Sequence, residues 1–314
     1  KREIVKTLYL IKNHPKKFSL ENFTTCDRKD LYFSISKNKN IGFKNLLLRN
    51  QDFEEIISVN QNSNNNDLNN KKEIVSIKND QIITKDLKYD NKKIVFDSGI
   101  NICLENNSNL LINKSEVQFK SSANLPIKIK GCNNSNSSIV IDNSDILIEN
   151  LLLENLSSPE IDLRNLFGGL NIINSNLNTK NIKILNSLSE DAINFIDSNI
   201  KIKNISFDNV RSDALDSDFT NINIDTIICK NIGNDCLDLS FSNGKVSKLE
   251  GYFVKDKVLS LGENSNLKIN EIFSISSEIG IVAKDSSSLL VKNYLFEDVK
   301  IPIAAYIKKS EFGS

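Results

Sequence analysis

Aliphatic residues recur at a constant spacing of 22 positions from about Leu170 onward. The longest series contains Ile193, Leu215, Leu237, Leu259, Ile281 and Ile303. Three shorter series keep the same spacing: Ile202, Ile224 and Val246; Val210, Ile232 and Val254; Ile205, Ile227 and Leu249. A fixed period of this length indicates stacked structural repeats. Each repeat therefore predicts one coil of a solenoid, with equivalent residues about 4.8 Å apart in neighbouring coils.

Within each repeat, apolar and polar residues alternate with a period of two, which indicates strands and not helices. Asn, Ser, Asp and Gly separate these runs, as expected for turns. The LxxLxLxxN frame of leucine-rich repeats is absent from the sequence, and a β-sandwich would not keep one register across six units. The pattern predicts an all-β fold: a right-handed parallel β-helix with three faces, in which each coil has three strands of two to five residues.

The spacing is less regular before Leu170, although short β runs continue at 94–96, 100–104, 110–112, 117–119 and 127–129. Inserts at 133–138 and 157–164 predict loops that leave the coils. Residues 1–72 are expected to form a small α/β cap, with a helix that ends near Pro15 and a strand-like stretch at 31–35, followed by an Asn-rich linker. The β-helix itself is expected over 73–314.

Acidic and basic residues balance at 40 each, with an isoelectric point near 6.8, which argues against a nucleic-acid or anionic-membrane partner. Nothing in the sequence approaches the roughly 18 consecutive apolar residues of a membrane span. The single histidine, His14, excludes a histidine-based triad or zinc site. Five scattered cysteines lack a CxxC motif, and we expect them to pack as thiols unless export allows one pair to form a disulfide. The sequence contains no Met, not even at position 1, so we expect either a fragment of a longer protein with neighbouring domains or a processed mature chain.

Polar residues gather on one strand of each coil. If the Ile193 series points inward, an outward row follows: Asn194, Asp216, Asp238 and Ser260. A second row stacks Asp191, Asp213 and Asp235, with Lys257 next in line, and Asp218 adds another carboxylate. Stacked carboxylates repel one another, so a cation, a shared proton or Lys257 must offset the cost. Asp216, Asp218 and Asp238 are candidate calcium ligands, although no cofactor is required. Alternatively, these residues cap turns or form a solvated face.

The segments SDALD, GNDCLD, DKVLSLG and GIVAK, which span 212–284, resemble the motif order of polygalacturonases in the pectin-lyase-like β-helix superfamily. In that family two or three aspartates hydrolyse glycosidic bonds with inversion. The resemblance matches Asp213, Asp235 and Lys284 to functional residues of the family. Asn234, Lys257 and Val282 depart from the family pattern, and an amide at position 234 cannot act as the general acid.

The segments SDALDSDF, GNDCLDLS, LSLGENS, AKDSS and AAYIKKSEFG are similar to β-helix regions of bacterial spore coat protein H-like (CotH) proteins, over about residues 90–314. This resemblance implies a role at the cell surface or envelope and supplies no reaction.

Three functions follow as hypotheses. The first is an exported or cell-surface β-helix module that contacts polysaccharide without cleaving it. The second is a polysaccharide lyase, variant glycosidase or epimerase with Asp213, Asp235 and Lys257 as catalytic residues. In both cases, the substrate would be bound by Asp191, Asn194, Asp216, Asp218, Asp238 and Lys284. The third is a structural spacer or assembly domain.

Overall fold

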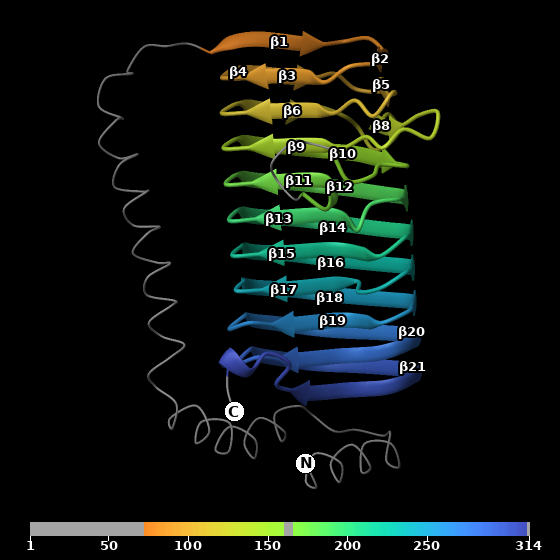
Figure 1. Cartoon of the computed structure of the whole chain (residues 1–314), viewed down its shortest axis with the longest axis vertical. Coiled ribbons are helices and arrows are strands. Elements are labelled where there is room, and N and C mark those ends of the chain that lie inside the picture. The colour runs from red at the N-terminus through yellow and green to blue at the C-terminus, as the bar shows by residue number, and fades with distance from the viewer. Residues whose placement is uncertain (1–71, 160–165, 313–314) are drawn as a thin grey trace, which may run out of the picture.

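The computed structural model describes residues 72–159 and 166–312. Almost all of these residues lie in strands, which wind into a parallel β-solenoid of about 10 turns. The coils stack along the long axis of the molecule (Figure 1). This architecture confirms the predicted parallel β-helix. The predicted cap and linker, at residues 1–71, lie outside the described residues.

The first coils contain short strands that are separate on each face. They are β1 (Glu73–Ile77), β2 (Gln81–Ile83), β3 (Leu87–Asp90), β4 (Lys92–Phe96), β5 (Asn101–Leu104), β6 (Leu110–Asn113), β7 (Glu116–Phe119), β8 (Ile127–Gly131) and β9 (Ile139–Asp142). All five β runs expected from the sequence before Leu170 coincide with strands in this set.

Later coils each combine a short strand with a long one. These strands are β10 (Asp145–Glu154), β11 (Gly168–Ile173), β12 (Asn176–Ser187), β13 (Asp191–Ile196), β14 (Asn199–Val210), β15 (Asp213–Asp218), β16 (Asn221–Ile232), β17 (Leu237–Ser240), β18 (Asn243–Val254), β19 (Lys257–Gly262), β20 (Asn266–Lys284) and β21 (Ser288–Tyr306). A 3₁₀ helix, η1 (Ser310–Phe312), follows. The prediction of three strands of two to five residues is therefore wrong for these coils, because β12, β14, β16 and β18 continue through a bend and cover two faces.

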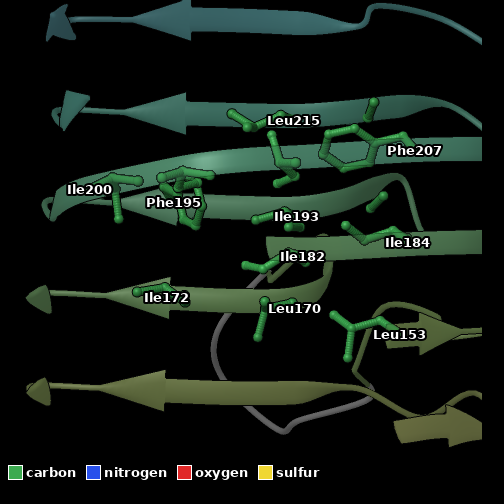
Figure 2. Close-up of a cluster of buried hydrophobic side chains, with 14 of the residues drawn as sticks. Leu153, Leu170, Ile172, Ile182, Ile184, Ile193, Phe195, Ile200, Phe207 and Leu215 are labelled. Carbon is green, nitrogen blue, oxygen red and sulfur yellow. The ribbon is translucent and has the colours of Figure 1, made fainter. Parts of the chain in front are cut away.

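The register reproduces the repeat read from the sequence. Ile193 pairs with Leu215, and the same series continues through Leu237, Leu259, Ile281 and Ile303. The three shorter aliphatic series also pair as expected. Leu170, Ile193 and Leu215 lie one above another in the core (Figure 2). Burial of these files supplies the main stabilisation of a solenoid, since each coil contacts only its neighbours.

Two coils are longer than the rest. Asn176 and Asp145 are hydrogen-bonded neighbours 31 positions apart, and the additional residues lie between β10 and β11, where the insert 157–164 was expected. Ser138 and Asn109 are neighbours 29 positions apart, but here the additional residues lie mainly at 120–126, between β7 and β8. The insert expected at 133–138 adds little, because Ile127 and Leu151, which pair across it, are 24 positions apart. From β11 onward the separation is 22 or 23 positions. The extra residues leave between strands, so the strands themselves keep their stacking.

A buried row of hydroxyl residues runs along the corner that follows the short strand. The row consists of Ser115, Ser144, Ser175, Ser198, Thr220, Ser242 and Ser265. The backbone N–H of Ser144 donates to Ser175 Oγ at 3.0 Å, and that hydroxyl donates to the carbonyl of Ile173 at 2.6 Å. Because a buried N–H without a partner is costly, these hydroxyls allow the chain to turn inside the stack.

Two disulfides join cysteines that we expected to pack as thiols. Cys103–Cys132 links neighbouring coils, and Cys229–Cys236 lies in the core of one coil. The expectation of packed thiols, with at most one disulfide, is wrong for these four residues because the coil geometry brings each Cα pair within 5.8 or 5.9 Å. Cys26 lies outside the described residues.

Candidate functional site

The candidate site is the outward side of β13, β15, β17, β19 and the last six residues of β20, which we call the polar face. Side chains alternate along these strands, so the core positions Ile193 and Phe195 place Asn194 on the outside. The register then aligns Asn194 with Asp216, Asp238 and Ser260, as predicted. Asp218, Ser240 and Lys284 occupy the parallel outward positions nearer to the corner.

Two segments border the polar face. On the side of the earlier coils, Val140 and Ile173 face outward, and Leu166 packs on them in a separate apolar cluster. On the other side, the C-terminal segment returns along the corner, where Phe312 contacts Phe241 and its carbonyl accepts a hydrogen bond from Ser286. Ser310–Phe312 lies against this corner, and Leu295 on β21 stays 52% exposed.

Asp213, Asp235 and Lys257, the predicted catalytic residues, form one connected ladder. Asp213 Oδ1 accepts hydrogen bonds of 2.7 Å from the backbone N–H of Asp235 and from the Asn234 side chain. Asp235 Oδ1 accepts one of 2.9 Å from the backbone N–H of Lys257, whose Nζ also lies 3.2 Å from that oxygen. These carboxylates therefore hold the next coil in place, as the turn-capping alternative implied.

Asn194 lies between two carboxylates of adjacent coils. Its Nδ2 donates to Asp191 Oδ2 at 2.9 Å and to Asp216 Oδ2 at 3.4 Å. Asn194 is 4% exposed, and among the described residues its Oδ1 has no hydrogen-bond partner. A buried acceptor without a donor costs about 1–3 kcal/mol, so this amide favours any donor that reaches it.

Lys284 lies flat on the polar face. Its Nζ donates to Ser260 Oγ at 2.9 Å and lies 4.0 Å from Asp238 Oδ1. Gly262 leaves the room for this side chain, since a Cβ there would meet Lys284 Cε at 2.8 Å. Asp238 Oδ1 has no hydrogen-bond partner among the described residues.

Sequence reasoning missed the residues at the corner of the polar face. Glu263 is 3% exposed; it accepts a hydrogen bond of 2.5 Å from Ser240 Oγ and pairs with Lys309. Phe219 and Phe241 stack at the same corner, with ring centroids 4.8 Å apart. Each phenylalanine directly follows an outward polar residue, Asp218 or Ser240. That position in the sequence could have indicated that both rings lie beside the polar face.

Burial and mutual repulsion change the acidity of the site. Burial, reinforced by neighbouring carboxylates, raises the pKa of Asp191 to about 7, of Asp235 to about 7 and of Asp218 to about 6. The same causes raise the pKa of Asp216 well above its ordinary value, and burial raises that of Asp213. Burial opposes the charged form of Lys257, but Asp256 and Asp235 outweigh it and raise the pKa of this lysine.

The arrangement thus has two parts with different chemistry. Asp213, Asp235 and Lys257 are engaged with one another and with the backbone. Asp216, Asp218 and Asp238, which are partly exposed, offer carboxylate oxygens to solvent or to a ligand. Over residues 72–159 and 166–312, no three His, Cys, Asp or Glu side chains are grouped so that they could hold a metal ion. Calcium binding at Asp216, Asp218 and Asp238 stays a prediction.

Comparison with family models, with curated proteins and with solved structures found no match to this chain. The described part of the chain also has no helix with the length and apolar character needed to cross a bilayer.

Proposed function

We propose that this protein is a β-helix module of an exported or cell-surface bacterial protein, and that its polar face binds polysaccharide without cleaving it. The observation that carries the proposal is the outward row Asn194, Asp216, Asp238 and Ser260, which repeats hydrogen-bonding groups at coil spacing. A long, flat surface of this kind suits an extended chain of hydroxyl-rich units. The resemblance to pectin-lyase-like and CotH-type β-helices agrees with it.

Export is supported by the two disulfides. Cys103–Cys132 and Cys229–Cys236 would persist in an oxidising compartment and be reduced in most cytosols. A location outside the cell or in its envelope is also where a module of this kind would meet polysaccharide.

Binding without cleavage is favoured by the hydrogen bonds of the ladder. Asp213 and Asp235 already accept backbone N–H groups, so their oxygens are committed to the fold. Asn234 stands where the resemblance requires a general acid, and an amide cannot supply a proton. Binding therefore falls to the less engaged Asp216, Asp218 and Asp238, together with Lys284.

A polysaccharide-active enzyme is the second candidate, because of the acidity of Asp191 and Asp218. With a pKa of about 7, the carboxyl group of Asp191 keeps its proton in a large share of molecules near neutral pH, as a general acid must. Asp218, with a pKa of about 6, is ionised in most molecules at pH 7 and keeps its proton only at lower pH.

The test is retention of the full chain on a panel of neutral, acidic and amino polysaccharides, with new reducing ends measured in parallel. We expect retention without cleavage, weakened at least tenfold by Asp216→Asn combined with Asp238→Asn. Asp225→Asn is the matched control, since Asp225 is exposed on β16, away from the polar face. New reducing ends that disappear in Asp191→Asn would establish the enzyme. No retention on any glycan would favour the spacer, and loss of retention with EDTA would support calcium.

A further inference from the structure

Two phenylalanines occupy a backbone conformation that large side chains rarely adopt. Phe219 and Phe241 have φ angles of 55° and 52°, in the left-handed region. Their rings are nearly parallel, with an interplanar angle of 4°, and Phe219 is 46% exposed. Neither residue belongs to the core cluster. The pair is therefore a strained, partly exposed aromatic surface at the corner of the polar face.

Most equivalent corners in other coils use Asn or Asp. Backbone hydrogen bonds align the corner series Asn91, Lys114, Asn143, Asn174, Asp197, Phe219, Phe241 and Asn264, and every member has a positive φ. Lys114 is the one long polar side chain in this series. Asn and Asp tolerate this conformation through local hydrogen bonds, whereas a bulky side chain costs of the order of 1 kcal/mol more. A strained aromatic residue that contributes nothing to the core and lies beside the polar face points to a role in binding at that face.

Phe219 stays 46% exposed although one face of its ring is covered. Phe241 covers the face toward the next coil, and Phe312 meets Phe241 edge-on at 5.7 Å. Toward the preceding coil, the corner residue is Asp197, whose side chain is shorter than that of phenylalanine. The exposed part of Phe219 therefore adds an apolar surface to the edge of the polar face.

Carboxylates surround this apolar surface. Asp218 directly precedes Phe219, and the charges of Asp238 and Glu263 both act on Asp218. Lysines offset only part of this charge: Lys309 pairs with Glu263, and Lys284 donates to Ser260. Two acceptors without a hydrogen-bond partner among the described residues, Asn194 Oδ1 and Asp238 Oδ1, lie buried beneath this surface and add to its negative character. The surface thus accepts hydrogen bonds and positive charge, and it would repel a uronic acid.

We propose that Phe219 stacks against a pyranose ring of a glycan built from N-unsubstituted amino sugars, with the ammonium group among Asp216, Asp218 and Asp238. This inference rests on the proposed binding of polysaccharide and specifies the chemical class of that polysaccharide. The apolar ring face of the sugar covers the exposed phenylalanine. The ammonium group donates to the free carboxylate oxygens and gains from the nearby aromatic ring. A neutral glycan has no ammonium group to interact with these carboxylates, and the carboxylates of an acidic glycan would be repelled by them.

The test is calorimetric titration of the full chain with hexamers of glucosamine, N-acetylglucosamine and galacturonate at pH 6 to 7. We expect the glucosamine hexamer to bind at least tenfold more tightly than the other two. Its binding should release protons, because a cation favours the ionised carboxyl groups. Proton release is measured by repeating the titration in buffers of different ionisation enthalpy.

Phe219→Asn restores the corner residue of other coils, so the variant should fold, and it should weaken glucosamine binding at least tenfold. Phe253→Asn is the matched control: Phe253 is also exposed with a positive φ, but it lies at a different corner, beside Arg211 and Lys255. Phe219→Leu, which keeps an apolar side chain without a flat ring, should behave like Phe219→Asn.

Unchanged binding in both Phe219 variants would overturn the stacking assignment. Equal affinity for the N-acetylated hexamer would overturn the amino-sugar assignment while leaving polysaccharide binding intact. Binding of none of the hexamers, and of no polysaccharide in the retention panel, would overturn the inference and the proposed function together.

Discussion

Asp213 Oδ1 accepts a hydrogen bond of 2.7 Å from the backbone N–H of Asp235, the residue 22 positions further along the chain. The Asp213 side chain thus holds the backbone of the next coil at Asp235, two residues before β17 begins at Leu237. Asp235 Oδ1 accepts a hydrogen bond from the backbone N–H of Lys257 in the same way, so two carboxylates join three successive coils.

This relationship predicts different results for two substitutions of Asp213. Asp213→Asn keeps an oxygen acceptor and should change the free energy of unfolding by less than about 1 kcal/mol. Asp213→Ala leaves the N–H of Asp235 without its partner and should cost about 1–3 kcal/mol. Urea denaturation of both variants measures the difference. Equal stability of the two variants would show that the hydrogen bond contributes nothing.

Lys257 is predicted to stabilise the fold by compensating Asp235. The side chain of Asp235 is 3% exposed, so Lys257→Met would leave its carboxylate without its cation and should cost about 3 kcal/mol at pH 8. Adding Asp235→Asn should recover most of that loss, because the amide carries no charge. A double variant no more stable than Lys257→Met would contradict this interpretation.

Stability should fall as the pH rises from about 4 to 8. Asp191, Asp213, Asp216, Asp218 and Asp235 all have pKa values above their ordinary 3.8, so the folded state binds protons more tightly than the unfolded state. The contribution of all five groups is complete below pH 4, and that of Asp191, Asp218 and Asp235 is lost as the pH passes about 6 to 7.

We expect a net loss of about 2 kcal/mol, seen as a Tm roughly 5 °C lower at pH 8 than at pH 5 by circular dichroism. Asp216→Asn should reduce this difference, since it removes both a titrating group and a neighbouring charge. A Tm that rises across the same interval would contradict the assigned directions.

Both disulfides should be present in protein produced in an oxidising compartment. Peptide mapping without reduction should recover Cys103 linked to Cys132 and Cys229 linked to Cys236. Cys103→Ala with Cys132→Ala should lower the free energy of unfolding by about 3 kcal/mol, through greater freedom of the unfolded chain. Dithiothreitol should then have a smaller effect on the double variant than on the original protein.

The fold could be predicted from the sequence because its main determinant is periodic. The register of Ile193, Leu215 and Leu237 follows from spacing alone, and so does the outward position of Asp216. Once the inward series is known, the alternation of side chains along a strand determines which residues point outward.

Other features depend on where the chain leaves a strand. Nothing periodic marks Glu263, which pairs with a lysine 46 residues later, or Phe219, which takes a position that Asn or Asp occupies in most other coils. Cys103–Cys132 joins coils that break the period, and Cys229–Cys236 forms across a turn within one regular coil, so the spacing of the cysteines in the sequence did not reveal them. The positions of residues in one regular coil can be predicted from the next, whereas residues that depart from the repeat can be placed only from the three-dimensional structure.

The long coils have a consequence for how such a molecule can change. Coils with separations of 29 and 31 positions stack as regularly as those of 22, because the additional residues leave at the corners and the strands retain their partners. Loops on the surface can therefore change in length without altering the packing of the core. Segments could be acquired or lost at 120–126 or 157–164 in the course of evolution, giving the molecule new edges for recognition while its interior stays as it was.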